Sequence, residues 1–424
     1  MSGKTANVVT EEDVRMMYDD FYKFLTECGV NSVKADNGFY PDYVEATGDR
    51  RELIYSYQDA FMQAAEKHFG HRAISCMSQT PQNLFYSFLD NGKRPPYAVR
   101  NSDDFFPDAP ESHTWHIFCN AHNSVLTQHL NILPDWDMFQ TAGANAYMHA
   151  AARCLSGGPI YITDVPGEHD IDLINQMVAI GFDGRHRILR PGIIGRATEV
   201  YDKPHDRRFL RVGAGHLSVR YLGLFNMGEG ESMELVTLEA MTRTKSAGSY
   251  VVTKHYQKGK KVYVLYNPSD VVPVKLQPNG GHDILAAHPI IKVGSLECAV
   301  LGLVGRMTGA AVLESPVRAE EDAAGPGYSI SVTIKALGPL AIWLKDGKVY
   351  RGDGGIKAHI CFPHKNRVQT REVKEIQLGL ADDTIAFDIE SAWADLVHDS
   401  NGTRIPVEDK QALRELDVII SVQA

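Results

Sequence analysis

The chain has 424 residues, of which 44% are hydrophobic and 23% are charged, and its formal net charge is −10 at pH 7. This composition is that of an ordinary globular protein, and it leaves no basic surface of the kind that nucleic-acid-binding proteins need. Since a domain usually holds roughly 100–200 residues, the length predicts more than one domain, and we expect two.

The N-terminus and the cysteines bear on the compartment. The opening residues, MSGKTANVVTEEDVRMMYDD, contain no apolar core of a signal peptide, and no run approaches the ~20 apolar residues that span a bilayer. We therefore expect a cytoplasmic protein with no membrane partner. The six cysteines are widely spaced and form no C-x-x-C pair, so we expect neither a disulfide framework nor a metal or other cofactor: Cys28, Cys76, Cys119, Cys154, Cys298 and Cys361.

The first part of the chain alternates between helical and strand patterns. A helix is expected from about Thr10 to Gly29, followed by a short strand, Ser32–Asp36. Further strands are expected at 72–78, 97–103, 132–138 and 159–164, and further helices at 53–69, 84–89, 113–130, 146–157 and 170–181. Five strands separated by helices predict an α/β fold. We expect a partial (β/α)8 barrel of about five βα units, with residues 1–183 as the C-terminal portion of a catalytic barrel.

From about Gly184 the pattern changes to alternating segments bounded by Gly, Pro and Asn, such as RFLRVGAG and KKVYVLYN. Such segments are typical of antiparallel strands. Residues 184–424 are therefore expected to form a C-terminal all-β domain, a β-sandwich. Since this half shows no clustered acids or histidines at metal-ligand spacing, we expect it to support and pack.

Acidic residues follow the ends of two expected strands: Asp103 and Asp104 after the third, and Asp135 and Asp137 within PDWDM at the end of the fourth. In an α/β barrel the loops that leave the carboxyl ends of the strands converge on one pocket. Two carboxyl groups ~5–5.5 Å apart can cleave a glycosidic bond with retention, and Asp36 and Asp103 end different strands. Spacing alone does not decide this, because acids at strand ends also cap the following helices.

Several local motifs occur in one order along the chain: VKAD, RNSDDF, PDWDMF, HAAARCLSGGPIYITD and VPGEHD. Together they resemble glycoside hydrolase family 36, and most closely its raffinose synthase and alkaline α-galactosidase (seed imbibition protein) branch. The resemblance covers most of residues 10–200. It implies a retaining enzyme for α-galactosides such as raffinose, working through a covalent galactosyl-aspartate. The raffinose-synthase likeness also suggests galactinol as donor and sucrose as acceptor, with transfer and hydrolysis both left open.

The resemblance also implies roles for single residues. Asp36 becomes the nucleophile, as the acid of a K-x-D strand end, and Asp103 becomes the general acid/base. Substrate binding is expected from seven residues: Lys34, Cys76, Arg100, Asp104, Asp135, Trp136 and Asp164. Structural alternatives stay open for several of them: an ion pair for Lys34, a buried thiol for Cys76, a salt bridge for Arg100, core packing for Trp136 and a helix cap for Asp164. The histidines 113, 116, 122 and 129 are interpreted as structural.

The chain departs from the family in one large respect. Family members carry an N-terminal β-domain and eight barrel strands, whereas this chain begins just before the fourth. The strands Ser32–Asp36 and Pro159–Asp164 would then be open edges, and we expect residues 1–424 alone to be poorly soluble or oligomeric and to turn over no α-galactoside. The alternative to an enzyme is a non-catalytic homologue or carbohydrate-binding fragment.

Overall fold

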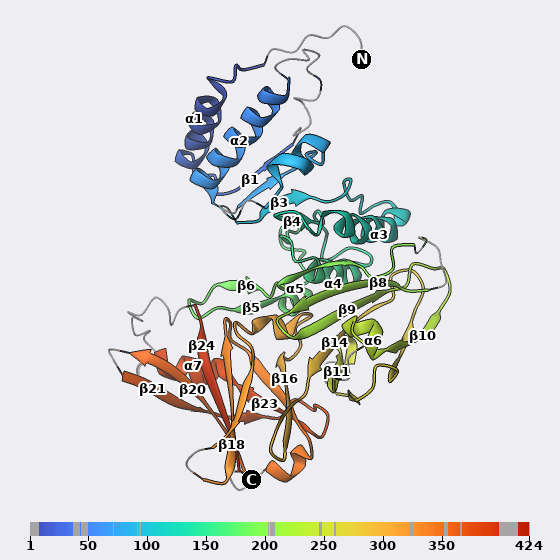
Figure 1. Ribbon diagram of the computed structural model, residues 1–424, viewed down its shortest axis with the longest axis vertical. Coiled ribbons are helices and arrows are strands. Elements are labelled where there is room, and N and C mark those ends of the chain that lie inside the picture. Colours follow the sequence, from blue (N-terminus) through green and yellow to red (C-terminus); the bar gives the residue numbers. More distant parts are fainter. Residues whose placement is uncertain are drawn as a thin grey trace. The chain divides into compact units, whose positions relative to one another are not determined.

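The computed structural model describes residues 8–36, 43, 50–70, 72–90, 92, 95–201, 203, 208–245, 248–257, 260–322, 325–351, 355–364, 367–397 and 414–423 (Figure 1). These residues fall into two compact units. The first comprises Met1–Phe105, Cys119–Met138 and Gly158–Tyr161, and the second comprises Phe106–Phe118, Phe139–Gly157 and Ile162–Ala424. The predicted domain boundary between residues 183 and 184 stays a prediction.

The first unit is built on a parallel sheet. Its strands are neighbours in chain order: β1 (Val33–Ala35), β2 (Ala73–Ser75), β3 (Tyr97–Arg100) and β4 (Ile132–Asp135). Strands that follow one another in chain order with helical crossovers form the wall of a βα barrel. The predicted α/β class is confirmed, and β1 lies at the end of this sheet.

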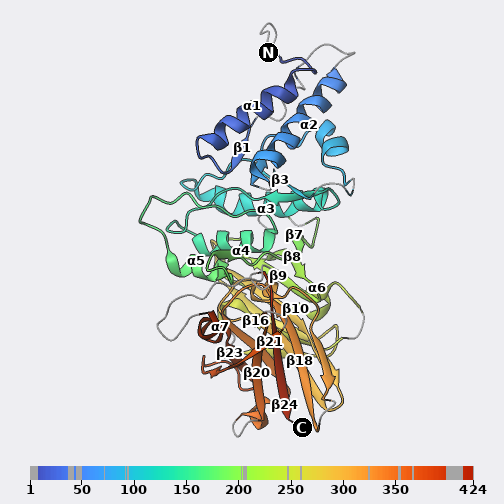
Figure 2. The same cartoon turned by 90° about the vertical axis from the view of Figure 1, so that its left-hand side faces the viewer.

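The helices of the first unit bury aromatic side chains. They are α1 (Val14–Glu27), α2 (Arg50–Phe69), the π-helical turn η2 (Asn83–Ser87) and the last turns of α3 (Pro110–Thr127). Helices α1 and α2 lie side by side (Figures 1 and 2), and the rings of Tyr22 and Phe69 meet edge to face at 5.2 Å. After α1, Gly29 turns the chain with φ +89°, a value that glycine adopts without strain.

The segment Pro159–Asp164, predicted as a fifth strand, pairs less than expected. Its only pairing among the described residues is one isolated parallel bridge between Phe139 and Ile162. Two prolines, Pro134 in β4 and Pro159, have no amide hydrogen to contribute to a ladder. At Gly158 a side chain would meet the carbonyl oxygen of Pro134 at 1.9 Å, so only glycine permits this approach.

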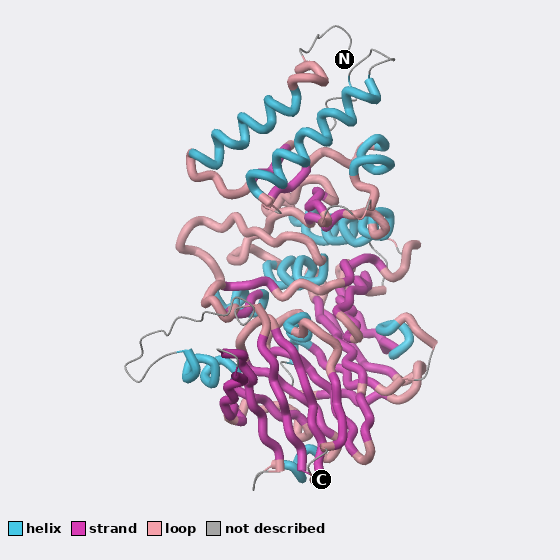
Figure 3. Tube along the Cα trace, turned by 60° about the vertical axis from the view of Figure 1, so that its left-hand side comes forward, coloured by secondary structure: helices cyan, strands magenta, loops and turns pink. Residues whose placement is uncertain are grey.

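The second unit is dominated by antiparallel sheets (Figure 3). One sheet has the order β12-β11-β14-β9-β8-β7, with bounds β7 Ile193–Ala197, β8 Leu210–His216, β9 Val219–Phe225, β11 Tyr250–Lys254, β12 Val262–Leu265 and β14 His282–Pro289. Two short pairs accompany it: β10 (Ser232–Thr237) with β13 (Val271–Leu276), and β5 (Val178–Ile180) with β6 (His186–Ile188).

Two five-stranded sheets share a single hydrophobic core. The first runs β15-β16-β19-β23-β22, with bounds β15 Ile291–Val293, β16 Leu296–Leu303, β19 Pro339–Leu344, β22 Glu375–Ile376 and β23 Thr384–Asp388. The second runs β17-β18-β24-β20-β21, with bounds β17 Arg318–Glu321, β18 Gly327–Ile334, β20 Ile356–His364, β21 Arg367–Val373 and β24 Leu416–Gln423. Along β18 every second residue is buried, and Ile330 and Ile342 of the two sheets enter the same core. This confirms the expected β-sandwich.

The helices of the second unit are short: α4 (Ala146–Ser156), α5 (Ile171–Met177), α6 (Leu238–Thr242), α7 (Ile389–Val397) and the 3-10 turns η3 (His255–Gln257), η4 (Gly309–Val312) and η5 (Gly347–Tyr350). Among all the helices that the structure describes, none has the length and apolar content that crossing a membrane requires.

Candidate active site

The carboxyl ends of β1 to β4 carry most of the predicted site residues. Ala35 pairs with Ser75, Ser75 with Val99, and Arg100 with Asp135, so the strands end close to one level. Residues placed directly after parallel strands therefore share one edge of the sheet, and that edge carries the active site in βα barrels.

A cluster that we call the Arg100 centre lies at this edge: Arg100, Asp104, Asp135, Asp137 and Tyr161. The Arg100 guanidinium donates from Nε to Asp135 at 3.0 Å, from Nη1 to Asp104 at 2.8 Å, and from Nη2 to Asp137 at 2.6 Å. Its side chain is 4% exposed, and that of Asp135 is 0% exposed. One guanidinium thus holds three carboxylates, an arrangement that its planar fork of donors allows.

The pKa values of the two buried acids of this centre are shifted in opposite directions. Burial raises the pKa of Asp135, although Arg100 and the Tyr161 hydroxyl oppose this. Burial alone would also raise the pKa of Asp137, but the Phe105 amide and Arg100 outweigh it and hold that pKa below its usual value. Burial raises the pKa of Tyr161, so this hydroxyl stays protonated. Paired groups whose environments push their pKa values apart are typical of functional sites.

The predicted nucleophile lies beside two of its expected neighbours. Asp36 follows β1, and Lys34 Nζ is 3.5 Å from its Oδ1. Cys76, which follows β2, is buried and hydrogen-bonded to Asp36, and burial together with this bond raises the pKa of Cys76 to about 11. The thiol is therefore protonated at neutral pH and donates to the carboxylate. Residues 37–42 lie outside the described part of the chain.

The adjacent acids Asp103 and Asp104 differ in their surroundings. Both are exposed, but Asp104 is held by Arg100. Asp103 lies near Cys119 of α3, where burial, with help from the Asp103 charge, raises the pKa of the thiol. Among the described residues the Asp103 carboxylate makes no hydrogen bond or ion pair. Its predicted role as acid/base and its predicted pairing with Asp36 stay predictions.

Two further predicted residues have mainly structural contacts. Trp136 is 0% exposed, and its indole N–H lies 3.3 Å from Ser124 Oγ, so protein covers the ring that was expected to face a sugar. Asp164 lies in the second unit, where its Oδ1 accepts from the Thr141 hydroxyl and the Ala142 amide, each at 2.9 Å. The sequence had left open both core packing for Trp136 and a capping role for Asp164.

Two members of the Arg100 centre were missing from the predicted binding residues. Asp137 was expected near the pocket as an acid at a strand end, but without a binding role. Tyr161 was not among the predicted site residues, although in PIYITD it alternates with Ile160 and Ile162 and would face the opposite side of a strand. A tyrosine on the other face of an apolar strand is the signal that could have identified it.

His113 of α3 and His149 of α4 form a buried chain of hydrogen bonds within the second unit. Arg153 Nη1 lies 2.9 Å from His149 Nδ1, His149 Nε2 lies 2.9 Å from His113 Nδ1, and His113 Nε2 lies 3.1 Å from the Pro107 carbonyl. Since arginine only donates, each imidazole must be neutral and must donate from Nε2 to the next acceptor. The described residues contain no group of histidines, cysteines or acids that could hold a metal ion.

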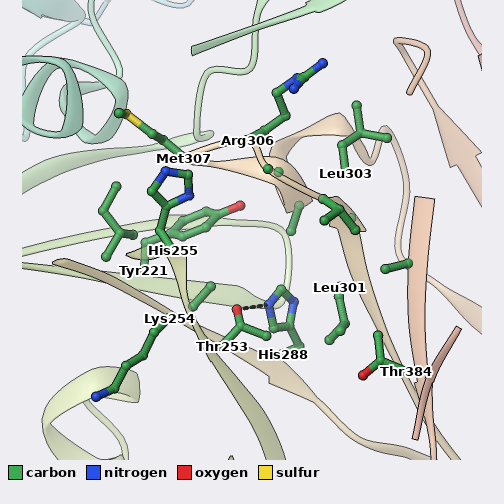
Figure 4. A pocket seen from close by; sticks show the side chains of 18 of the residues that line it. Tyr221, Thr253, Lys254, His255, His288, Leu301, Leu303, Arg306, Met307 and Thr384 are labelled. Carbon is green, nitrogen blue, oxygen red and sulfur yellow. Dashed lines mark hydrogen bonds between the residues drawn. The ribbon is translucent and has the colours of Figure 1, made fainter. Parts of the chain in front are cut away.

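A cavity of about 60 Å³ lies in the second unit (Figure 4). Its lining includes Tyr221 of β9, Leu303 of β16 and His288 of β14, whose Nε2 is 3.3 Å from the Thr253 hydroxyl. Burial lowers the pKa of His288 to about 4, so it is neutral. None of the described lining residues was predicted as a site residue.

Comparison with known proteins finds a family match for the first half of the chain. Residues 3–209 match the family model described as raffinose synthase or seed imbibition protein Sip1. This region is therefore similar to the raffinose synthase family. Every predicted site residue of the chain lies within this raffinose synthase region.

Individual relatives of the raffinose synthase region are plant proteins. A probable galactinol–sucrose galactosyltransferase 6 from Arabidopsis thaliana is 35% identical over 193 residues, covering 45% of this chain and 24% of the relative. A stachyose synthase from Pisum sativum is 30% identical over 187 residues, covering 42% of this chain and 21% of the relative. The matched part of the chain thus spans about a quarter of the length of these relatives. A solved α-galactosidase I from Mortierella vinacea overlaps 64% of this chain and 71% of its own, with 14% identity and a TM-score of 0.46.

Proposed function

We propose that this chain carries the catalytic residues of a retaining enzyme that acts on α-galactosides. The observation that carries the proposal is the succession of Asp36, Cys76, Arg100 and Asp135 at the carboxyl ends of four consecutive parallel strands. The names of the relatives, galactosyltransferases and a stachyose synthase, support the same substrate class.

In the proposed reaction the Asp36 carboxylate attacks the anomeric carbon of the galactosyl group. The bond from this carbon to the leaving oxygen breaks, the oxygen keeps the electron pair, and the general acid protonates it. A galactosyl ester of Asp36 results. In the second step an acceptor oxygen attacks the same carbon, its proton passes to the carboxylate that acted as acid, and Asp36 departs.

Lys34 and Cys76 support the nucleophile in this proposal. The Lys34 ammonium lies 3.5 Å from Asp36 Oδ1 as its ion-pair partner, and the Cys76 thiol donates a hydrogen bond to the same carboxylate. Both contacts orient the Asp36 carboxylate.

We assign the acid/base role to Asp103, as the family motif implies. The Asp104 carboxylate is occupied by the Arg100 guanidinium, whereas the Asp103 carboxylate makes no ion pair among the described residues. Asp104 is the second candidate because it is the acid that contacts the Arg100 centre.

Galactinol and raffinose-family oligosaccharides are the proposed donors, and sucrose or water is the proposed acceptor, because both would compete for the same ester intermediate. The proposed chemistry needs no cofactor. We propose the cytoplasm as the compartment, since all six cysteine thiols are free, as expected in a reducing environment.

The test is the Asp36→Asn variant with an aryl α-galactoside and with raffinose. Asn cannot form the ester, so turnover should be lost, while Asp20→Asn, an exposed change on α1, should leave it unchanged. Near-normal turnover by Asp36→Asn would assign the nucleophile to another acid. If wild-type chain binds raffinose but never turns over either substrate, the carbohydrate-binding alternative holds instead.

A further inference from the structure

Tyr161 joins the partners of the Arg100 centre through one hydroxyl. Its oxygen lies 3.0 Å from Arg100 Nη2, from Asp135 Oδ2 and from Asp137 Oδ1. Arginine only donates and ionised carboxylates only accept, so the hydroxyl accepts from Arg100 and gives its single hydrogen to one carboxylate at a time. Tyr161 therefore completes a closed set of bonds around the guanidinium.

Asp137 connects this set to the turn that carries the adjacent acids. Its Oδ1 binds Arg100 Nη2 at 2.6 Å, and its Oδ2 accepts the backbone amide of Phe105 at 2.8 Å. The residue has φ +62°, in the left-handed region that a non-glycine residue rarely adopts. Such a backbone persists where surrounding contacts fix it, and it is frequent at functional sites.

The turn after β3 is held by contacts at three of its residues: Ser102, Asp104 and Phe105. Asn120 Nδ2 donates to Ser102 Oγ at 2.9 Å, Arg100 binds the Asp104 carboxylate at 2.8 Å, and Asp137 holds the Phe105 amide. Asp103 is the residue of this turn whose carboxylate the surrounding described groups leave unbonded. The anchors therefore fix the backbone on both sides of Asp103 without occupying its side chain.

We propose that Tyr161 and Asp137 are positioning residues that hold the turn Asp103–Phe105 in the conformation needed for acid/base catalysis. Asp137 acts directly on the turn through Phe105. Tyr161 acts on it through Arg100 and Asp137. The catalytic part of this inference rests on the proposed function, whereas the anchoring of the turn does not.

The test compares Tyr161→Phe and Asp137→Asn with the control Tyr57→Phe. Tyr57 is in the same unit, and within the described part of the chain its hydroxyl bonds to the Val9 backbone. The hydrogen-exchange rate of the Phe105 amide, measured in peptides that cover residues 101–106, reports the hydrogen bond between this amide and Asp137. The measurement does not require enzymatic activity. Because Asp137→Asn removes the charged acceptor of the Phe105 amide, the exchange of this amide should become roughly tenfold faster. Tyr161→Phe should give a smaller increase.

Tyr57→Phe should leave the exchange of the Phe105 amide unchanged. In peptides that cover Ala73–Ser75 of β2, none of the three variants should change the exchange rate. Unchanged Phe105 exchange in both Tyr161→Phe and Asp137→Asn would overturn the inference. So would an equal rise in the β2 peptides, because this reports loss of global stability. If Asp137→Asn does not fold, Tyr161→Phe alone decides the outcome, since it removes one oxygen atom.

A measurement of activity tests the catalytic part of the inference. In a chain that turns over an α-galactoside, Tyr161→Phe should lower kcat roughly tenfold with little change in KM, and should shift the limb of the pH profile that reports the acid. An equal rise in KM with an unchanged pH profile would contradict a positioning role. Absence of wild-type activity would refute the proposed function, while the exchange result would still decide the anchoring.

Discussion

Arg100 Nε donates to Oδ2 of Asp135 at 3.0 Å, and the two residues are direct cross-strand partners at the carboxyl ends of β3 and β4. The pair is buried, so each charge depends on the other for compensation. Asp137 and Tyr161 share the same guanidinium, and the proposed site depends on this cluster remaining intact.

The first prediction concerns this pair. Arg100→Met leaves the buried carboxylates of Asp135 and Asp137 without their counter-charge, and removal of one partner of a buried ion pair typically costs ~3–5 kcal/mol. In Arg100→Met/Asp135→Asn the loss should be smaller than the sum of the single losses, as urea unfolding would show. Additive losses would mean that the two side chains are not energetically coupled.

The second prediction separates Asp103 from Asp104. Asp103→Ala should slow substrates with poor leaving groups by ~10²–10⁴-fold and activated substrates far less, because only poor leaving groups need protonation in the transition state. Asp104→Ala should give a smaller and unselective loss, since Asp104 anchors the turn on Arg100. The reverse pattern, measured as kcat/KM on both substrate types, would transfer the acid/base role to Asp104.

The third prediction uses the buried histidine chain. Burial, followed by the charge of Arg153 and the neighbouring histidines His113, His116 and His282, holds the pKa of His149 well below its usual value. The unfolded chain therefore binds a proton near pH ~6.5 that the folded chain does not bind, so stability falls as pH falls below ~6.5.

The slope attributable to His149 is up to ~1.4 kcal/mol per pH unit. The free energy of unfolding of His149→Gln should thus fall less steeply between pH ~6.5 and ~5 than that of the wild-type chain. His129→Gln, an exposed change in the same histidine-rich segment, should leave the slope unaltered. Parallel curves for wild type and His149→Gln would contradict the buried neutral state.

Local periodicity accounts for what could be predicted of the fold. The alternation of helical and strand patterns predicted strands at 32–36, 72–78, 97–103 and 132–138. The observed strands lie within these segments and end earlier, at Ala35, Ser75, Arg100 and Asp135. The helix expected at 170–181 ends at Met177 instead, because Val178–Ile180 pairs with His186–Ile188 across a turn at Gly184. A partner that lies beyond a turn is not visible in helical periodicity.

The site was predictable only as far as motifs and strand ends reach. Asp36, Arg100 and Asp135 stand at strand ends and could be found from sequence. Tyr161 could be found only as a tyrosine that alternates with Ile160 and Ile162. Its role could not be predicted, because it comes from a hydroxyl that meets Arg100, 61 positions away. Burial of Trp136 likewise depends on long-range packing that spacing does not report.

Covalent labelling tests the central claim most directly. A 5-fluoro-α-galactosyl fluoride needs no protonation of its leaving group, so it reports the nucleophile alone. After incubation and proteolysis, mass spectrometry should find the fluorogalactosyl group on the peptide that contains Asp36, and Asp36→Asn should remain unlabelled. A label on any other acid, or no label on the folded wild-type chain, would contradict the proposed function.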